Sequence, residues 1–387
     1  MKPFKVLPTL IARAGIRIVF RLACLFWPVN RDKITFASYR AEELKDNLAY
    51  IYEAWKKQGL SREPVFLLKR YRPGLLGKFD YFIHMIRASW HLATSRFFII
   101  DDYFFPVYVI EPRMGTDIVQ LWHAAGAFKK FGHSTINKSF GPSEDYLKLV
   151  NVHSNYTKVM VSGSEVIPYY AEAFNMPESR VLPLGVPRTD YFYDETANHA
   201  LSDRFFKEYP ELKGKTLLLY APTFRGKSHD QGVFECPFDL KKLKTDLENY
   251  AVLVNLHPYM QKGMMRDKSL DGFVYMMDGK YNIQELLSLS DRLLTDYSSI
   301  IFDYSLLERP IAFFAHDLED YELERGFYFN FRSFIPGPLF TETAELVAWL
   351  KSDTFDRAKV KAFKQRFFDH ADGKSSERIV AYLSSIK

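Results

Sequence analysis

Residues 292–314 read RLLTDYSSIIFDYSLLERPIAFF, and this stretch decides the fold class. A short apolar run ends in the polar residues Thr-Asp-Tyr-Ser-Ser, a helical pattern follows, and a second apolar run closes the stretch. Continuous apolar strands that alternate with helices are typical of a parallel sheet covered on both faces. The stretch therefore predicts a strand–helix–strand unit with hydroxyl groups just beyond the carboxyl end of its first strand.

The same pattern recurs along the chain in two series of apolar runs. Helical patterns separate the runs, so each series predicts a doubly wound, Rossmann-like α/β domain. We expect an N-terminal segment over 1–33, a first domain over 34–190, and a second domain with a helical tail over 191–387. The expected strands are 34–38, 64–69, 97–102, 117–122, 158–163 and 180–185, followed by 216–224, 250–258, 273–278, 292–297 and 310–314.

The chain has 387 residues and a formal net charge of +5, and the positive excess is concentrated at the N-terminus. Residues 1–33 hold seven basic side chains and one acidic side chain, which leaves the rest of the chain close to neutral. A nucleic-acid-binding protein usually spreads a basic patch over its fold, so nucleic acid is not an expected partner. Cys24 and Cys236 show neither a metal-type spacing nor a disulfide framework, as expected in a reducing compartment.

Residues 3–30 combine apolar side chains with arginines four residues apart. Arg13, Arg17 and Arg21 would form one positive stripe on a helix, and Trp27 closes the segment. The arginines interrupt the apolar run too often for a transmembrane helix or a signal peptide. We therefore expect an amphipathic helix in the headgroup region of an anionic membrane. The alternative is a helix that docks on the protein's own core.

Ligands of open parallel sheets bind beyond the carboxyl ends of the strands, so the polar residues there are candidates for the site. His123 follows the apolar run 117–122, and the small residues up to Gly126 would let a phosphate or substrate approach the backbone. An imidazole here can act as a general base toward a hydroxyl, because its pKa lies near working pH. Alone, His123 would also fit a core histidine that is hydrogen-bonded to a neighbouring strand.

His257 also stands at the end of an apolar run, where Pro258 stops the strand. A hydrogen-donating imidazole at this place could stabilise negative charge on a phosphoryl group. By itself, His-Pro is a common dipeptide with little specificity.

The hydroxyl-rich stretch 295–299 falls where a strand gives way to a helix. Ser298 and Ser299 would add donors to the free N–H groups of the helix N-terminus, and we expect a phosphate there. The same expected donor site includes Thr295, Asp296 and Arg225, since Arg225 ends the motif YAPTFR and offers a bidentate fork to phosphate. The alternatives are helix capping by the serines and a surface ion pair of the arginine.

Three well-known motifs are missing from the sequence. It contains no GxxxxGKS, no GxGxxG after the first strand and no HExxH, which argues against an ATPase, a dinucleotide oxidoreductase and a zinc protease. No Asp-x-Asp follows a strand of the second domain, so a metal-bridged diphosphate is not indicated. We expect no cofactor and no metal site.

Taken in order, six motifs resemble the CDP-glycerol glycerophosphotransferase family of teichoic acid synthesis. The resemblance implies a GT-B fold, in which two Rossmann-like domains enclose an interdomain cleft, held by an N-terminal amphipathic region at the cytoplasmic face of the cell membrane. It also implies catalytic roles for His123 and His257, and nucleotide diphosphate binding by Arg225, Thr295, Ser298 and Ser299. The motifs are QLWHAAGAFKKFG, LGVPRTDYF, YAPTFR, NLHP, LLTDYSSIIFDYSLLERPIAFF and YELERGFYF, between about residues 95 and 370.

The activity that the resemblance implies is transfer of glycerol phosphate from CDP-glycerol to a hydroxyl of an undecaprenyl-diphosphate-linked saccharide, with release of CMP. His123 would deprotonate the acceptor hydroxyl, while the other site residues hold the diphosphate. A CDP-ribitol ribitolphosphotransferase is an alternative, as are a GT-B glycosyltransferase that uses a nucleotide sugar and a non-catalytic membrane-surface adaptor. Two departures from the family pattern bear on the substrates: Ala124 replaces a frequent glycine, and Asn330 a common aspartate.

Overall fold

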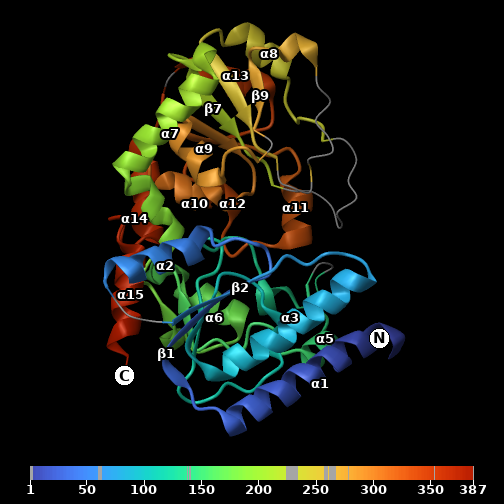
Figure 1. Ribbon diagram of the computed structural model, residues 1–387. Coiled ribbons are helices and arrows are strands. Elements are labelled where there is room, and N and C mark those ends of the chain that lie inside the picture. The colour runs from blue at the N-terminus through green and yellow to red at the C-terminus, as the bar shows by residue number, and fades with distance from the viewer. Residues whose placement is uncertain are drawn as a thin grey trace. The chain divides into compact units, whose positions relative to one another are not determined.

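The computed structural model describes residues 3–59, 63–136, 138, 141–223, 234–256, 260, 267–277, 279–352 and 354–386, with the backbone alone for residues 3–6. The chain divides into two compact units (Figure 1). The first unit comprises Met1–Asp190 and Phe368–Lys387, and the second comprises Tyr191–Phe367. Each unit is built around its own parallel sheet, so the predicted α/β class with two parallel-sheet domains is confirmed.

The first unit contains a sheet in the order β2-β1-β3-β4-β5-β6, in which all neighbouring strands are parallel. Its strands are β1 (Asn30–Ser38), β2 (Glu63–Leu68), β3 (Ser95–Ile100), β4 (Asp117–Gln120), β5 (Lys158–Met160) and β6 (Val181–Leu182). Its helices are α1 (Pro3–Phe26), α2 (Asp46–Lys57), α3 (Leu75–Thr94), α4 (Phe105–Tyr108), α5 (Glu144–Leu149), α6 (Ile167–Phe174) and α15 (Ser375–Ser385).

The second unit repeats this architecture with a sheet in the order β12-β11-β10-β7-β8-β9, again with parallel neighbours. Its strands are β7 (Thr216–Tyr220), β8 (Tyr250–Val254), β9 (Val274–Met276), β10 (Arg292–Thr295), β11 (Ile311–Phe314) and β12 (Leu339–Phe340). Its helices are α7 (Glu195–Glu208), α8 (Leu240–Asp246), α9 (Ile283–Leu289), α10 (Ile300–Ser305), α11 (Leu318–Arg325), α12 (Phe331–Phe334), α13 (Thr343–Ser352) and α14 (Arg357–Phe367).

The central strands form the core of each unit because helices remove both of their faces from water. All six residues of β3 are buried, as are all five of β8, which is why these runs show no polar alternation. In the first unit, Leu48 and Ile51 of α2 pack into the same cluster as Phe36 and Phe97 from the sheet. The three- and four-residue spacing of buried positions along α2 gives the helix one apolar face.

Helix α15 belongs to the first unit, whereas the sequence placed the whole helical tail in the second domain. Ile379, Val380 and Leu383 are fully buried in the core of the first unit, where α15 packs on α2. The carboxylate of Asp190 accepts hydrogen bonds from the backbone N–H groups of Ser375 (2.9 Å) and Ser376 (2.8 Å) at the start of α15. The domain boundary after residue 190 is therefore also the point that anchors the returning C-terminal helix.

Helix α1 forms where the sequence predicted a helix, and it lies along α3 (Figure 1). Ile16, Phe20 and Ala23 are buried on its inner face. At Gly15 an added Cβ would lie only 3.1 Å from Ile86 Cδ1 of α3, so the Ile86 side chain would have to shift by a few tenths of an ångström. This packing corresponds to the alternative in which the helix docks on the protein's own core.

The arginines of α1 differ in their surroundings. Arg17 Nε donates to the carbonyl oxygen of Val109 at 2.5 Å, so Arg17 lies against the protein, whereas the Arg21 side chain is 71% exposed and its Nη2 lies 3.9 Å from Glu111 Oε1. The outward face of the helix is largely apolar, with residues that are 41–74% exposed: Leu7, Leu10, Ile11, Ile18, Leu22 and Leu25. Within the described residues, no helix is long and apolar enough to cross a membrane.

Candidate active site

The carboxyl ends of three adjacent strands meet beside the point where the first sheet reverses its strand order. The chain leaves β1 toward β2 on one side and returns to β3 on the other, so β1 and β3 form the switch point at which open α/β sheets bind ligands. Arg40 follows β1, Asp102 follows β3, and His123 follows β4. The parallel pairing brings these three residues together although they are far apart in the sequence.

His123 is held by a buried carboxylate. Its Nδ1 lies 3.2 Å from Oδ2 of Asp102, whose side chain is 5% exposed, while the imidazole itself is 42% exposed. Burial alone would raise the pKa of Asp102, but the hydrogen bond and charge of His123 and the charge of Arg40 outweigh it and hold that pKa below its usual range. An exposed imidazole on a buried, ionised carboxylate is arranged for proton transfer, which excludes the alternative of a core histidine.

The backbone before His123 is fixed by two buried amide side chains. Gln120 accepts a hydrogen bond from the Trp122 N–H at 2.8 Å and donates to the carbonyl oxygen of Asp102 at 3.0 Å. Asn47, at the start of α2, donates to the carbonyl oxygen of Trp122 at 2.7 Å. Trp122 has a φ of +53°, a region that costs a non-glycine residue roughly 1–3 kcal/mol. The amide hydrogen bonds stabilise this turn, which directs His123 away from the core.

Sequence patterns alone did not identify Asn47, Gln120 or Asp102 as members of the site. Asp102 was visible as a polar residue at a strand end, but its pairing with His123 depends on β3 and β4 being neighbours. The roles of the two amides depend on contacts between segments: Asn47 donates to the distant Trp122, and Gln120 joins the nearby Trp122 to Asp102. Gly126 is buried in the loop after His123, and Ala124 accepts a hydrogen bond from the Tyr170 hydroxyl at 2.9 Å.

In the second unit, the expected donor-binding stretch lies at the corresponding switch point. Strand β7 pairs with β8 on one side and with β10 on the other; Thr295 is the last residue of β10, and residues 296–299 follow it. The Thr295 hydroxyl donates to the carbonyl oxygen of Ala221 at 2.7 Å, and Asp296 Oδ1 accepts from the Thr223 N–H at 2.8 Å. Both side chains are buried, so in this structure they join the ends of β7 and β10.

Ser298 and Ser299 are only half-buried and stand at the start of α10. The hydroxyl of Ser299, the N-cap residue, makes no capping hydrogen bond, while Ser298 Oγ accepts from the Ile300 N–H over a long 3.4 Å. Ser298 therefore makes only a weak capping hydrogen bond, and Ser299 makes none. Asn330, the second departure from the family pattern, accepts from the Ser333 N–H at 3.2 Å and caps α12, a role that aspartate would fill equally well.

Two of the predicted site residues, Arg225 and His257, lie outside the described residues. Strand β7 ends at Tyr220, five positions before Arg225, and β8 ends at Val254, three positions before His257. Both strands end at the same edge of the sheet as β10. The roles of the two residues stay predictions.

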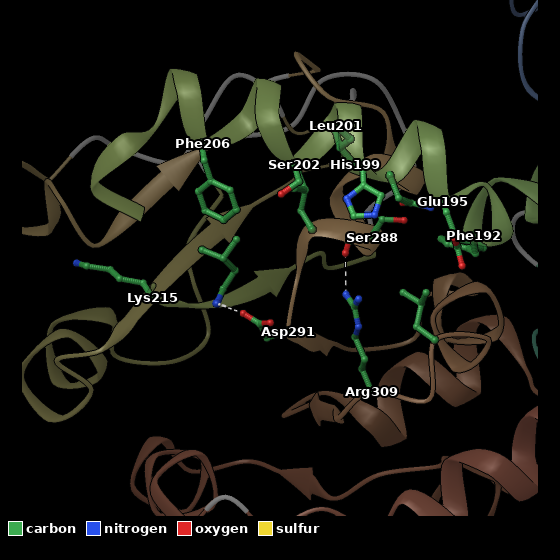
Figure 2. Close-up of a pocket in the computed structure, with 14 residues that line it drawn as sticks. Phe192, Glu195, His199, Leu201, Ser202, Phe206, Lys215, Ser288, Asp291 and Arg309 are labelled. Carbon is green, nitrogen blue, oxygen red and sulfur yellow. Dashed lines mark hydrogen bonds between the residues drawn. The ribbon is translucent and has the colours of Figure 1, made fainter. Parts of the chain in front are cut away.

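Two pockets of the described residues lie at the opposite edges of the sheets. A pocket of about 620 Å³ in the second unit is bordered by α7 and by Lys215, Asp291 and Arg309, each of which directly or nearly precedes a strand (Figure 2). Its charged groups are used in backbone contacts: Asp291 accepts from the Leu217 N–H, and Arg309 donates to the carbonyl oxygens of Ser288 and Ser290. Ligands of parallel sheets bind at the other edge, which makes this pocket a poor candidate for the site.

A second pocket, of about 600 Å³, lies in the first unit beside Lys158 and Arg180, at the amino ends of β5 and β6. It contains none of the predicted site residues. Among the described residues, no group of three His, Cys, Asp or Glu side chains could hold a metal ion. The expectation of a site without metal therefore stays a prediction.

Two parallel-sheet units with polar groups at their switch points define an α/β protein with two Rossmann-like domains. The chain belongs to the CDP-glycerol:poly(glycerophosphate) glycerophosphotransferase family, whose model matches residues 18–385. The resemblance seen in the motifs is thereby confirmed, and with it the expectation of an enzyme.

Known relatives of this family act in teichoic acid synthesis. The chain is 46% identical over 97% of its length to a teichoic acid ribitol-phosphate primase of Bacillus spizizenii, 97% of which is covered. It is 32% identical over 79% of its length to a teichoic acid glycerol-phosphate primase of Bacillus subtilis, 77% of which is covered. Its fold is similar to the structure of the wall teichoic acid polymerase TagF, with a TM-score of 0.77, 23% identity, and coverage of 99% of this chain and 98% of that one.

Proposed function

We propose that the chain transfers an alditol phosphate from a CDP-alditol to a hydroxyl of a lipid-linked saccharide, such as one carried on undecaprenyl diphosphate. The acceptor oxygen attacks the phosphorus that bears the alditol, and the bond from this phosphorus to the bridging oxygen breaks. CMP leaves with the electron pair of that bond, and the hydroxyl proton passes to His123. Every atom is accounted for without a cofactor or a redox step.

The contact between His123 and Asp102 is the single observation that carries this proposal. In the tautomer that carries its proton on Nδ1, the nitrogen 3.2 Å from Asp102 Oδ2, the imidazole keeps the lone pair of Nε2 for the acceptor hydroxyl. General base catalysis of this kind contributes about 10²–10⁴-fold to a rate. Asp102 then stabilises the positive charge that His123 gains.

The donor diphosphate is assigned to the switch point of the second sheet. Ser299 has a half-exposed hydroxyl without a capping partner, and Ser298 has only a long hydrogen bond, so both can turn toward a phosphate. Arg225 and His257 would add charge and a hydrogen-bond donor from the ends of the neighbouring strands. Thr295 and Asp296 would contribute indirectly, because their side chains hold the ends of β7 and β10 together.

The alditol is ribitol in our proposal, with glycerol as the alternative. The sequence favoured CDP-glycerol as the donor, but the chain shares 46% identity with a ribitol-phosphate primase and 32% with a glycerol-phosphate primase. The alignment with the ribitol-phosphate primase also covers nearly the full length of both chains.

We also assign the outward face of α1 to the membrane surface that carries the acceptor. Its exposed leucines and isoleucines are joined by exposed apolar residues of α3, which lies alongside: Leu75, Leu76, Phe79 and Ile83. An amphipathic helix buries such a face at the boundary of headgroups and acyl chains, with cationic side chains on its flank. Arg13, Arg17, Arg21 and Trp27 would then flank the apolar face instead of forming the face that contacts the lipid.

A donor panel tests the proposed function. The full chain is incubated with vesicles that contain the lipid-linked saccharide and with CDP-ribitol, CDP-glycerol or a UDP-sugar, and CMP or UDP release is measured. CMP release from CDP-ribitol is the expected result, and release from CDP-glycerol alone would reassign the alditol. Turnover of the UDP-sugar alone would indicate a glycosyltransferase, and no turnover of any donor would favour an adaptor.

Two histidine variants test whether the activity measured in the donor panel depends on His123. His123→Ala should lower the rate by about 10²–10⁴-fold. His199→Ala is the matched control, because His199 is exposed and lines the pocket at the amino edge of the second sheet (Figure 2). Equal losses in the two variants would refute the assignment of His123 as the base.

A further inference from the structure

Arg40 shares the carboxylate of Asp102 with His123. The Arg40 Nε forms an ion pair with Asp102 Oδ2, the same oxygen that lies 3.2 Å from His123 Nδ1. It also donates to the hydroxyl of Tyr39 at 3.2 Å. One buried oxygen atom therefore places a guanidinium and the base imidazole side by side at the switch point of the first sheet.

The guanidinium is anchored at one end and available at the other. Its two described partners, Asp102 and Tyr39, both contact Nε, and within the described residues no hydrogen bond is made by Nη1 or Nη2. The side chain is 54% exposed, although its carboxylate partner is 5% exposed. An arginine held in this way presents a planar pair of donors with little loss of side-chain freedom on binding.

The charges around the guanidinium are those of two adjacent carboxyl groups, and a nearby histidine adds none. Burial, followed by the charge of Asp102, raises the pKa of Asp101 to about 7, so this second carboxyl is about half protonated at pH 7. His153 contacts the Trp122 ring edge-on, and burial lowers its pKa to about 3, which keeps it neutral. Arg40 balances the charge of Asp102, and the partial protonation of Asp101 reduces the negative charge that would oppose an anion.

We propose that Arg40 binds a substrate phosphate beside His123, and that Asp102 is the positioning residue for both. Bidentate contacts between guanidinium and phosphate combine charge with fixed geometry, and the loose transition state of phosphoryl transfer depends on such positioning. The phosphate belongs either to the CDP-alditol or to the diphosphate of the lipid-linked acceptor. This proposal rests on the proposed function, because it takes His123 to be the base.

Substitution of Arg40, with steady-state kinetics in which each substrate is varied in turn, tests the proposal. Arg40→Gln should raise one KM by about 10- to 100-fold, since it removes a charge-assisted hydrogen-bond pair. A rise in the KM of the CDP-alditol identifies the donor phosphate, and a rise in the KM of the acceptor identifies the lipid-linked diphosphate. Arg40→Lys keeps the charge without the planar fork and should recover only part of the loss.

The control is Arg72→Gln, because Arg72 is also an exposed arginine of the first unit paired with a carboxylate, in this case Glu42. It should leave both KM values within about threefold, as is usual for surface ion pairs. If Arg40→Gln lowers kcat but leaves both KM values unchanged, Arg40 serves Asp102 alone and the proposal is overturned. An active His123→Ala variant would instead overturn the proposed function, so the two failures are distinguishable.

Discussion

The side-chain amide of Asn47 donates a hydrogen bond to the carbonyl oxygen of Trp122, 2.7 Å away, and thereby ties the start of α2 to the residue that precedes His123. Its carbonyl oxygen accepts from the Arg188 N–H at 2.9 Å, so one buried side chain also reaches the end of the first domain segment. Asn47 is 1% exposed. Three segments that are distant in the sequence therefore meet at a single amide next to the proposed base.

Removal of this amide should lower both stability and turnover. Asn47→Ala leaves two buried backbone groups without partners, at about 1–3 kcal/mol for each group. We expect thermal unfolding at a lower temperature and a kcat at least tenfold lower, with KM values nearly unchanged, because the Trp122 turn that directs His123 is released. Asn47→Asp keeps the acceptor for Arg188, replaces the donor to Trp122 by a carboxylate oxygen, and adds a buried carboxyl group. An unchanged kcat in Asn47→Asp would show that the hydrogen bond does not position His123.

The carboxylate of Asp102 should be needed for the rate and not for substrate binding. Asp102→Asn keeps the shape but removes the charge that orients and stabilises His123, and kcat should fall by about 10²–10⁴-fold. Asp101→Asn is the matched control, because Asp101 is the adjacent buried carboxyl, and burial raises its pKa to about 7. Similar losses in both variants would contradict a specific role for Asp102.

Asp101 should make the fold less stable as the pH rises. Burial raises its pKa in the folded state to about 7, above the value of about 3.9 of an unfolded chain, so the folded state binds the extra proton between these two values. Stability from this group is present below about pH 4 and is lost as the pH rises toward 7. The melting temperature of Asp101→Asn, relative to the natural chain, should therefore increase by a few degrees between pH 5 and pH 8. A constant difference over this range would show that Asp101 does not titrate there.

Thr295 and Ser299 should respond differently to the loss of their hydroxyls. Thr295→Val removes the hydrogen bond to Ala221 in a fully buried position and should cost about 1–3 kcal/mol of stability, with little change in the KM of the donor. Ser299→Ala removes a hydroxyl that makes no capping hydrogen bond, so stability should hardly change while the KM of the CDP-alditol rises severalfold. Urea unfolding and donor kinetics on the same preparations check both statements. A destabilised Ser299→Ala with an unchanged donor KM would return Ser299 to a capping role.

The outward face of α1 should bind vesicles through its apolar side chains. Ile18 and Leu22 are 58% and 48% exposed, so Ile18→Asp combined with Leu22→Asp should leave the fold intact and weaken binding to anionic vesicles at least tenfold. Arg13→Gln should have a smaller effect, of about 1 kcal/mol, that disappears at high salt. Vesicle sedimentation at two salt concentrations measures the apolar and the electrostatic contributions to binding. Stronger dependence on Arg13 than on the apolar pair would restore the arginine stripe as the membrane contact.

Sequence patterns predicted the strands because the cause of each strand is local. A run such as 97–100 or 250–254 is apolar throughout, and only a doubly covered parallel strand buries such a run completely. The two-residue strand β12 carries too few residues for such a pattern and was missed. For the same reason, the strand ends predicted His123 and the hydroxyl-rich stretch 295–299: polar residues that follow an apolar strand need no knowledge of distant segments to be recognised.

The sequence by itself determined the two parallel sheets, the helix over α1 and the strand-end position of His123. Only the tertiary structure decided that Asp102, Arg40 and Asn47 surround this histidine, because strand order and helix packing join segments that no local pattern connects. The tertiary structure also showed that α15 packs on the first unit. From the sequence alone, the apolar face of Ile379, Val380 and Leu383 could pack on either unit, because nothing in the sequence identifies α2 as its partner. The outward face of α1 was settled in the same way: the burial of Ile16, Phe20 and Ala23 against neighbouring residues turned the leucine and isoleucine face to solvent.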